Sequence, residues 1–177
     1  MLFRSVKLIA LTFVRTTELI GAKWCEIDFV EQQWRVPAER MKMKTPHIVP
    51  LSRQAIHTLE VLKIISGHCA LIFPNQNNTS KPMSNNTILK ALELAGYKHR
   101  MTGHGFRGLA STALHEQGFD HQHIELQLAH QELNQVSAAY NHALYIKQRT
   151  AMMQQWADYL DEIKAGAKVI PLHGKSA

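Results

Sequence analysis

A histidine and an arginine stand three residues apart in the stretch HGFRGLASTALHEQG, which runs from His104 to Gly118. Side chains at this spacing share one helix face within a single turn. The start of a helix adds free backbone N–H groups and a partial positive charge. The imidazole and the guanidinium of Arg107 at such a place favour a phosphodiester as ligand. An HxxR pair alone is more often an ordinary surface pair, so this interpretation needs partners elsewhere in the chain.

Further residues that suit phosphodiester chemistry follow one another along the chain. Arg15 comes directly after an apolar run of helical spacing, and the stretch ERMKMKTPHIVPLS carries Lys42. The stretch LAHQELNQVSAAYNHA supplies His130 and, ten residues later, Tyr140. Tyrosine is one of the side chains that form covalent intermediates, whereas arginine, lysine and histidine stabilise or protonate charged oxygens.

The order Arg, Lys, His-x-x-Arg, His, Tyr resembles the signature of the tyrosine recombinases. In particular, the stretches RMKMKTPHIVPLS, HGFR, AYNHA and MMQQWADYL are similar to the catalytic domain of phage-type integrases carried by prophages and genomic islands. The resemblance covers nearly the whole chain. It implies site-specific DNA recombination and integration, in which strands are cleaved and rejoined through a covalent 3′-phosphotyrosine. It also implies double-stranded DNA as partner, a homotetramer on that DNA, and no metal ion, cofactor or small-molecule substrate.

The resemblance implies a role for each of these residues. Tyr140 attacks the phosphodiester, while the guanidiniums of Arg15 and Arg107 hold the two non-bridging oxygens and stabilise the charge of the transition state. Glu18 is expected to orient Arg15 without touching DNA.

The other three residues handle protons and a hydrogen bond in the same scheme. His104 assists removal of the tyrosine proton, His130 donates a hydrogen bond to the phosphate, and Lys42 protonates the leaving 5′-oxygen. Lys44 remains a competitor for this last role, because the register of the hairpin that carries both lysines is inferred.

A second tyrosine competes for the role of nucleophile. Tyr145 begins a helix whose apolar face continues through Met152, Met153 and Trp156, so we expect it to pack. Two alanines precede Tyr140, and such small residues let a phosphate approach.

Four histidines between residues 115 and 130 could also be interpreted as a zinc site. The spacing of His115, His121, His123 and His130 offers no compact face of ligands. We therefore expect the first three to be surface or partly buried residues.

Composition sets the class of protein. The 177 residues correspond to one domain, and the net charge of +6 favours an anionic partner, with nucleic acid first. Cys25 and Cys69 lack metal-type spacing, and we expect them to be reduced core residues of a cytoplasmic protein. The longest apolar run, LIALTFV, is too short to span a bilayer, and it has no cleavage pattern of a signal peptide.

Local patterns predict an α+β fold, mainly helical with a small antiparallel sheet. Helices are expected to start near Ser5 and at the caps Ser52, Ser84 and Asp120, and short strands in EIDF, QWRVP and HIVPLS. Glycines at 96 and 118 suit helix C-termini. Residues 1–164 are expected to form the catalytic domain and 165–177 a tail that is mobile or docks on another subunit. The DNA-binding domains that precede such a domain in integrases are missing, so we expect a fragment.

Two other functions stay open at this point. One is a module that binds DNA or assembles on it without cleaving. The other is a nicking and closing activity like that of type IB topoisomerases, which uses the same covalent chemistry without strand exchange. A small-molecule hydrolase is disfavoured, because the chain has no nucleophile elbow.

Overall fold

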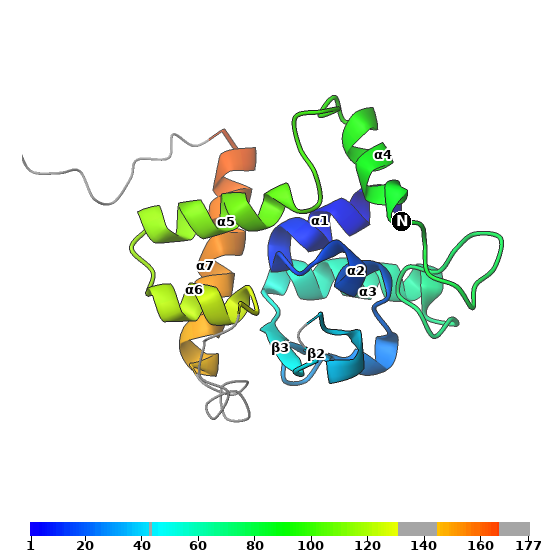
Figure 1. The fold of residues 1–177 in the computed structure, drawn as a ribbon, viewed down its shortest axis with the longest axis horizontal. Coiled ribbons are helices and arrows are strands. Elements are labelled where there is room, and N and C mark those ends of the chain that lie inside the picture. Colours follow the sequence, from blue (N-terminus) through cyan, green and yellow to red (C-terminus); the bar gives the residue numbers. More distant parts are fainter. Residues whose placement is uncertain (43, 131–144, 167–177) are drawn as a thin grey trace, which may run out of the picture.

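Seven α-helices and a three-stranded sheet make up the described part of the chain, residues 1–42, 44–130 and 145–166 of a computed structural model (Figure 1). The mainly helical α+β class predicted from the sequence is confirmed. The helices are α1 (Leu2–Thr12), α2 (Thr16–Ile20), α3 (Arg53–Ser66), α4 (Asn86–Leu94), α5 (Gly105–Glu116), α6 (His121–Gln127) and α7 (Ile146–Lys164). Two 3-10 helices, η1 (Trp24–Glu26) and η2 (Ala38–Arg40), stand in the connections.

The expected antiparallel sheet is present. Its strands β1 (Ile27–Asp28), β2 (Gln33–Val36) and β3 (His47–Pro50) lie in the order β1-β2-β3. Trp34 is paired with Ile27 on one side and Val49 on the other, and it is completely buried. This register turns one face of the sheet to the core, and it leaves the β2–β3 connection, which includes η2 and Lys42, at the edge.

The larger hydrophobic core lies around α1 and joins α2, α3, α4 and the sheet. Leu8 and Ile9 of α1 are fully buried in it. Helix α1, near the middle of Figure 1, packs closely against all the other helices of the described chain except α6. Arg15, three residues after the end of α1, is therefore attached to a helix that packs into the core.

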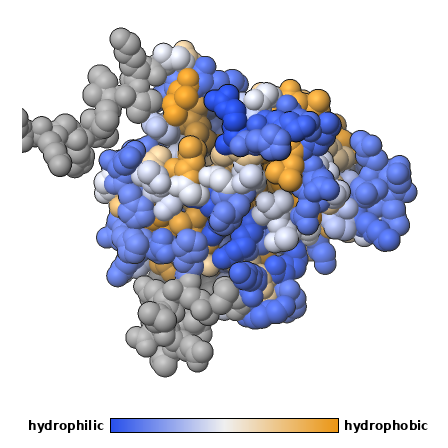
Figure 2. Space-filling view, turned by 45° about the horizontal axis from the view of Figure 1, so that its top comes forward, coloured by the Kyte–Doolittle hydropathy of each residue, from blue (hydrophilic) through white to orange (hydrophobic). Residues whose placement is uncertain are grey.

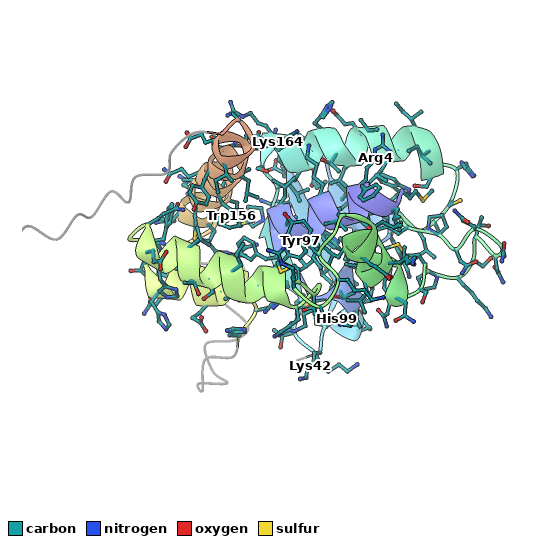
Figure 3. All side chains as sticks on the ribbon, turned by 90° about the horizontal axis from the view of Figure 1, so that it is seen from above. Arg4, Lys42, Tyr97, His99, Trp156 and Lys164 are labelled. Atoms are coloured by element: carbon teal, nitrogen blue, oxygen red, sulfur yellow. The ribbon has the colours of Figure 1, made fainter. Side chains whose placement is uncertain are left out.

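A second hydrophobic core joins α5, α6 and α7. Phe13, which ends α1 with a left-handed φ of 39°, belongs to this core, and its ring stands edge-on to Trp156 at 6.0 Å between centroids. The indole N–H of Trp156 donates to the Ala10 carbonyl oxygen at 2.8 Å. The tryptophan, labelled in Figure 3, thus fixes α7 to the end of α1.

Helix starts follow the predicted caps at two places out of four. Ser52 and Asp120 each accept a backbone N–H of their helix. At the third place the N-cap position of α4 is Asn85, one residue after Ser84, but Asn85 makes no side-chain cap bond and the Ser84 hydroxyl accepts the Asn86 backbone N–H at 3.3 Å. The prediction at Ser5 is wrong: α1 begins at Leu2, and the Ser5 hydroxyl donates to the Leu2 carbonyl inside the first turn.

The cysteines differ from the expectation. Cys25 is exposed and Cys69 is half-buried, so neither is a core residue, and both are free thiols. The histidines at 115 and 121 are exposed and hydrogen-bonded to each other, as expected for surface residues.

Hydrophilic residues cover most of the face shown in Figure 2, with smaller hydrophobic patches between them. Within the three described ranges, no helix is both long and apolar enough to cross a membrane.

Candidate active site

Arg15 stands at the N-cap of α2 and is held in place by Glu18. The Glu18 carboxylate accepts the Arg15 backbone N–H at 2.8 Å and its Nη1 group at 2.9 Å. Glu18 is only 2% exposed, so this ion pair is shielded from water on the carboxylate side. Nη2 of Arg15 donates to the Ala129 carbonyl oxygen at 3.3 Å. The expected orienting role of Glu18 agrees with this geometry.

Arg107 lies in the first turn of α5, with its guanidinium directed into the protein. Nη1 donates to the Phe13 carbonyl oxygen at 2.7 Å, and Nη2 donates to the Leu128 carbonyl oxygen. Burial, and after it the neighbouring positive charge of Arg15, lowers the pKa of Arg107 from its ordinary value to about 10. The group is still charged at neutral pH.

The two arginines meet at the C-terminal end of α6. Arg107 binds the carbonyl of Leu128, and Arg15 binds the carbonyl of Ala129. Carbonyls at a helix C-terminus carry partial negative charge and attract cations. The two guanidiniums are therefore next to each other, as a shared phosphate would require.

The same turn sets the place of His130. Ala129 adopts a left-handed φ of 49°, and the backbone N–H of His130 returns to the Glu125 carbonyl at 3.1 Å, which closes a Schellman motif. The imidazole Nδ1 of His130 lies 2.8 Å from a Glu125 carboxylate oxygen. This bond fixes the orientation of the ring, in the way that a carboxylate orients a working histidine.

His104 caps the start of α5 and is exposed. A groove with a volume of about 380 Å³ is lined by His104, Gly103, Thr16 and Thr17 among others. This groove connects the start of α5 to the start of α2, so His104 lies beside the element that carries Arg15.

Gly103 permits the close approach of these two helix starts. A Cβ atom at this buried position would stand 2.5 Å from the Thr16 hydroxyl oxygen. The Thr16 side chain or the backbone would have to shift, whereas the side chains of Ile88 and Ile9, at 3.6 Å, would stand at ordinary contact distance.

We expect Gly103→Ala to lower the free energy of unfolding by about 1–3 kcal/mol, the usual cost of overpacking a core. Urea unfolding measures it. Gly108→Ala in α5 is the matched control, because a Cβ there meets nothing within 4 Å. It should raise stability by roughly 0.5–1 kcal/mol, since alanine favours a helix over glycine. Equal stability of the two variants would contradict the close approach.

Lys42 stands apart from the other candidates. It is exposed in the β2–β3 connection and points outward at the edge of the molecule in Figure 3. Among the described residues it makes no hydrogen bond or ion pair, whereas Lys44 turns back to within 3.5 Å of the Glu39 carbonyl oxygen. The structure therefore does not join Lys42 to the site residues of α2, α5 and α6.

Arg40 holds the start of the β2–β3 connection in place, and the sequence did not predict this role. Its guanidinium donates to the Glu26 carboxylate and to the Glu18 carbonyl oxygen. The segment that leads to Lys42 is thus tied to the helix that carries Arg15. Its signal in the sequence was weak, because Arg40 stands in a polar stretch with three other cationic residues nearby.

Of the two candidate tyrosines, the structure describes Tyr145 alone. Tyr140 lies outside the described residues. Tyr145 caps α7 with a φ of 54°, it is 38% exposed, and its ring lies 4.7 Å from the His123 ring. Tyr145 therefore packs on a histidine ring near the surface, and not in the apolar core with Met152, Met153 and Trp156.

The fold is shared with solved recombinase structures. The integrase from mycobacterium phage Brujita gives a TM-score of 0.68 at 18% identity, over 99% of this chain and 54% of that chain. The XerA recombinase gives a TM-score of 0.61 at 17% identity, over 95% of this chain and 57% of that chain. At these identities the likeness establishes a common fold.

Sequence similarity establishes the family. A family model described as Phage integrase family matches residues 3–146. The chain is 49% identical over 173 residues to the integrase of Enterobacteria phage P4, covering 89% of this chain and 39% of that protein. It is 44% identical over 160 residues to the prophage integrase IntA of Escherichia coli strain K12, covering 90% and 39%. The chain belongs to the phage integrase family, and it spans about two fifths of the length of these two relatives.

Proposed function

We propose that this chain is the catalytic part of an integrase that cleaves and rejoins DNA strands in site-specific recombination. One observation carries the proposal: Arg15, Arg107 and His130 meet at the C-terminal end of α6 in a member of the phage integrase family. Two cations and an imidazole at one point suit the negative charge that develops on a phosphate during strand cleavage.

The arginines can exchange their backbone partners for DNA. A guanidinium has five N–H groups, and the carbonyls of Phe13 and Leu128 occupy only Nη1 and Nη2 of Arg107 with one bond each. A phosphate oxygen carries charge and is a stronger acceptor than a neutral carbonyl. A phosphodiester at the end of α6 therefore competes well for both arginines.

In this proposal, Tyr140 supplies the nucleophile. Its oxygen forms a bond to phosphorus as the bond to the 5′-oxygen breaks, which leaves a 3′-phosphotyrosine and a 5′-hydroxyl. The phosphate ester is conserved, so a second 5′-hydroxyl can displace the tyrosine and complete strand exchange.

Two proton transfers complete the chemistry. His104, exposed beside the groove at the start of α5, takes the tyrosine proton. Lys42 gives a proton to the leaving 5′-oxygen, because an alkoxide is a poor leaving group at neutral pH. Lys42 is exposed, and in this proposal the connection that carries it closes over the DNA after binding.

The proposed substrate is double-stranded DNA, bound by a homotetramer in the cytoplasm. The net charge of +6 supports an anionic partner. A fold neighbour, the Tn1549 transposon integrase, was solved in complex with circular intermediate DNA, with a TM-score of 0.56 at 15% identity over 86% of this chain. In this proposal residues 1–164 are the catalytic domain, and the DNA-binding domains of such integrases are separate from it.

A suicide substrate tests the proposal. The 177-residue chain is incubated with a nicked duplex that loses a short oligonucleotide on cleavage, so that the covalent species is trapped. We expect a protein–DNA adduct on a denaturing gel. Binding without an adduct would favour the non-cleaving module. An adduct that leads to relaxation of supercoiled DNA but never to joints between two duplexes would favour the topoisomerase-like activity.

A further inference from the structure

Arg149 in α7 is a fully charged side chain inside the protein. It is 1% exposed, and its acceptors among the described residues are neutral: Nε and Nη2 donate to Oε1 of Gln127 at 3.2 and 2.8 Å, and Nη2 also donates to the Ile48 carbonyl oxygen. Burial lowers the pKa of Arg149 from its ordinary value to about 10, so it keeps its charge at neutral pH.

Stability alone is a poor reason for such a residue. Taking a charge out of water is costly unless it is well paired, and apolar residues of similar volume often serve a core at least as well. The neighbours of Arg149 on the same face of α7, Met152, Met153 and Trp156, are apolar and buried. A methionine at 149 would continue that face without the cost of desolvation.

The arginine joins three elements at one point. Gln127 is the last residue of α6, Ile48 belongs to β3, and Arg149 lies in the first turn of α7. The His47 ring nitrogen Nε2 lies 3.2 Å from the Gln127 carbonyl oxygen, which adds a second link between β3 and α6. We call these four residues the Gln127 joint.

Each of the three elements leads to a part of the candidate active site. Gln127 immediately precedes Leu128 and Ala129, whose carbonyls hold the two site arginines. Strand β3 ends the connection that carries Lys42, and α7 follows the segment with Tyr140 in the sequence. The joint therefore ties the end of α6, which is followed by the carbonyls that hold Arg15 and Arg107, to strand β3 and to the start of α7.

The side-chain amide of Gln127 is oriented at some loss of stability. Its Nε2 group is buried and has no hydrogen-bond partner among the described residues, since its oxygen is turned to Arg149. An unsatisfied buried donor is destabilising, which again indicates a geometry retained for something other than stability.

We propose that Arg149 is a positioning residue for strand cleavage. It holds the end of α6 and strand β3 in register, so that the arginines and His130 meet the same phosphate as the proton donor on the β2–β3 connection. This inference rests on the proposed function and adds to it a residue that does not touch DNA.

Three variants of the full chain test the role. The measurements are the rate of adduct formation at saturating suicide substrate, the DNA affinity and the thermal midpoint. We expect Arg149→Met to slow the rate roughly 10- to 100-fold, as small misplacements of reacting groups do, with unchanged affinity. Arg149→Lys keeps the charge but cannot span Gln127 and Ile48 with one fork, so its rate should be intermediate. Met152→Ala, which opens a cavity in the same helix, should lower the thermal midpoint and leave the rate at the wild-type value.

The outcomes separate this inference from the proposed function. A wild-type rate for Arg149→Met, or an equal slowing by Met152→Ala at the same loss of stability, overturns the positioning role. If Arg149→Met fails to fold, Arg149→Lys decides by the same measurements, and a wild-type rate for it overturns the role. Absence of an adduct with the wild-type chain would instead defeat the proposed function, and this inference with it.

Discussion

Tyr140→Phe is expected to abolish the covalent adduct on the suicide substrate, while DNA affinity and the thermal midpoint remain at wild-type values. The substitution removes only a hydroxyl group, which is the proposed nucleophile, and no other group on the side chain can form the phosphate ester. Denaturing gels measure the adduct, and a binding assay on intact duplex measures the affinity.

Tyr145→Phe is the matched control. The Tyr145 ring lies against His123 at the start of α7, and losing its hydroxyl leaves that ring contact in place. This variant should form the adduct at the normal rate. The reverse pattern, with Tyr145 essential and Tyr140 dispensable, would show that the nucleophile is misassigned although the class of reaction survives.

The sequence predicted those features that depend on neighbouring residues. The strands at 27–28, 33–36 and 47–50 follow β-forming runs, and Ser52 and Asp120 satisfy the first N–H groups of the helices that follow them. Gly96 and Gly118 have φ values of 83° and 80°, conformations that glycine adopts without strain. Local chemistry decides each of these features, so a sequence alone reveals them.

Features that depend on distant contacts were missed. Ala129 takes a left-handed conformation that usually goes to glycine, and its carbonyl binds Arg15 from a distant part of the chain. No pattern around residue 129 indicates either fact. Phe13 lies in the apolar run of helical spacing that precedes Arg15, yet it ends α1 in a left-handed conformation and belongs to the second core.

The burial of Arg149 could be predicted from the sequence only in part. It precedes Met152, Met153 and Trp156 by three, four and seven residues, which is the spacing of one helix face. The spacing places Arg149 on the buried face of α7, but an arginine is usually exposed, so the residue type alone does not predict its burial. The order of the candidate site residues was enough to predict the family, whereas the backbone carbonyls that bring Arg15 and Arg107 together required the structure.

The second large effect is expected on the rate of DNA cleavage when Lys42 is replaced. Lys42→Ala is expected to slow cleavage about 10²- to 10⁴-fold, the usual contribution of a positioned proton donor. A lysine is protonated at neutral pH, and Lys42 is exposed with no partner among the described residues, so its ammonium group is available to the leaving 5′-oxygen. The rate of adduct formation on normal DNA measures the loss.

A substrate with sulfur in place of the bridging 5′-oxygen isolates this step. A thiolate leaves without a proton, so the sulfur substrate should restore most of the rate to Lys42→Ala. It should not restore Arg107→Ala, because that guanidinium serves the non-bridging oxygens. Lys44→Ala is the matched control on the same connection: its amine turns back toward the Glu39 carbonyl, and the variant should cleave normal DNA at the wild-type rate. Rescue of Lys44→Ala instead of Lys42→Ala would move the acid two residues along the hairpin, and rescue of neither would exclude lysine as the acid.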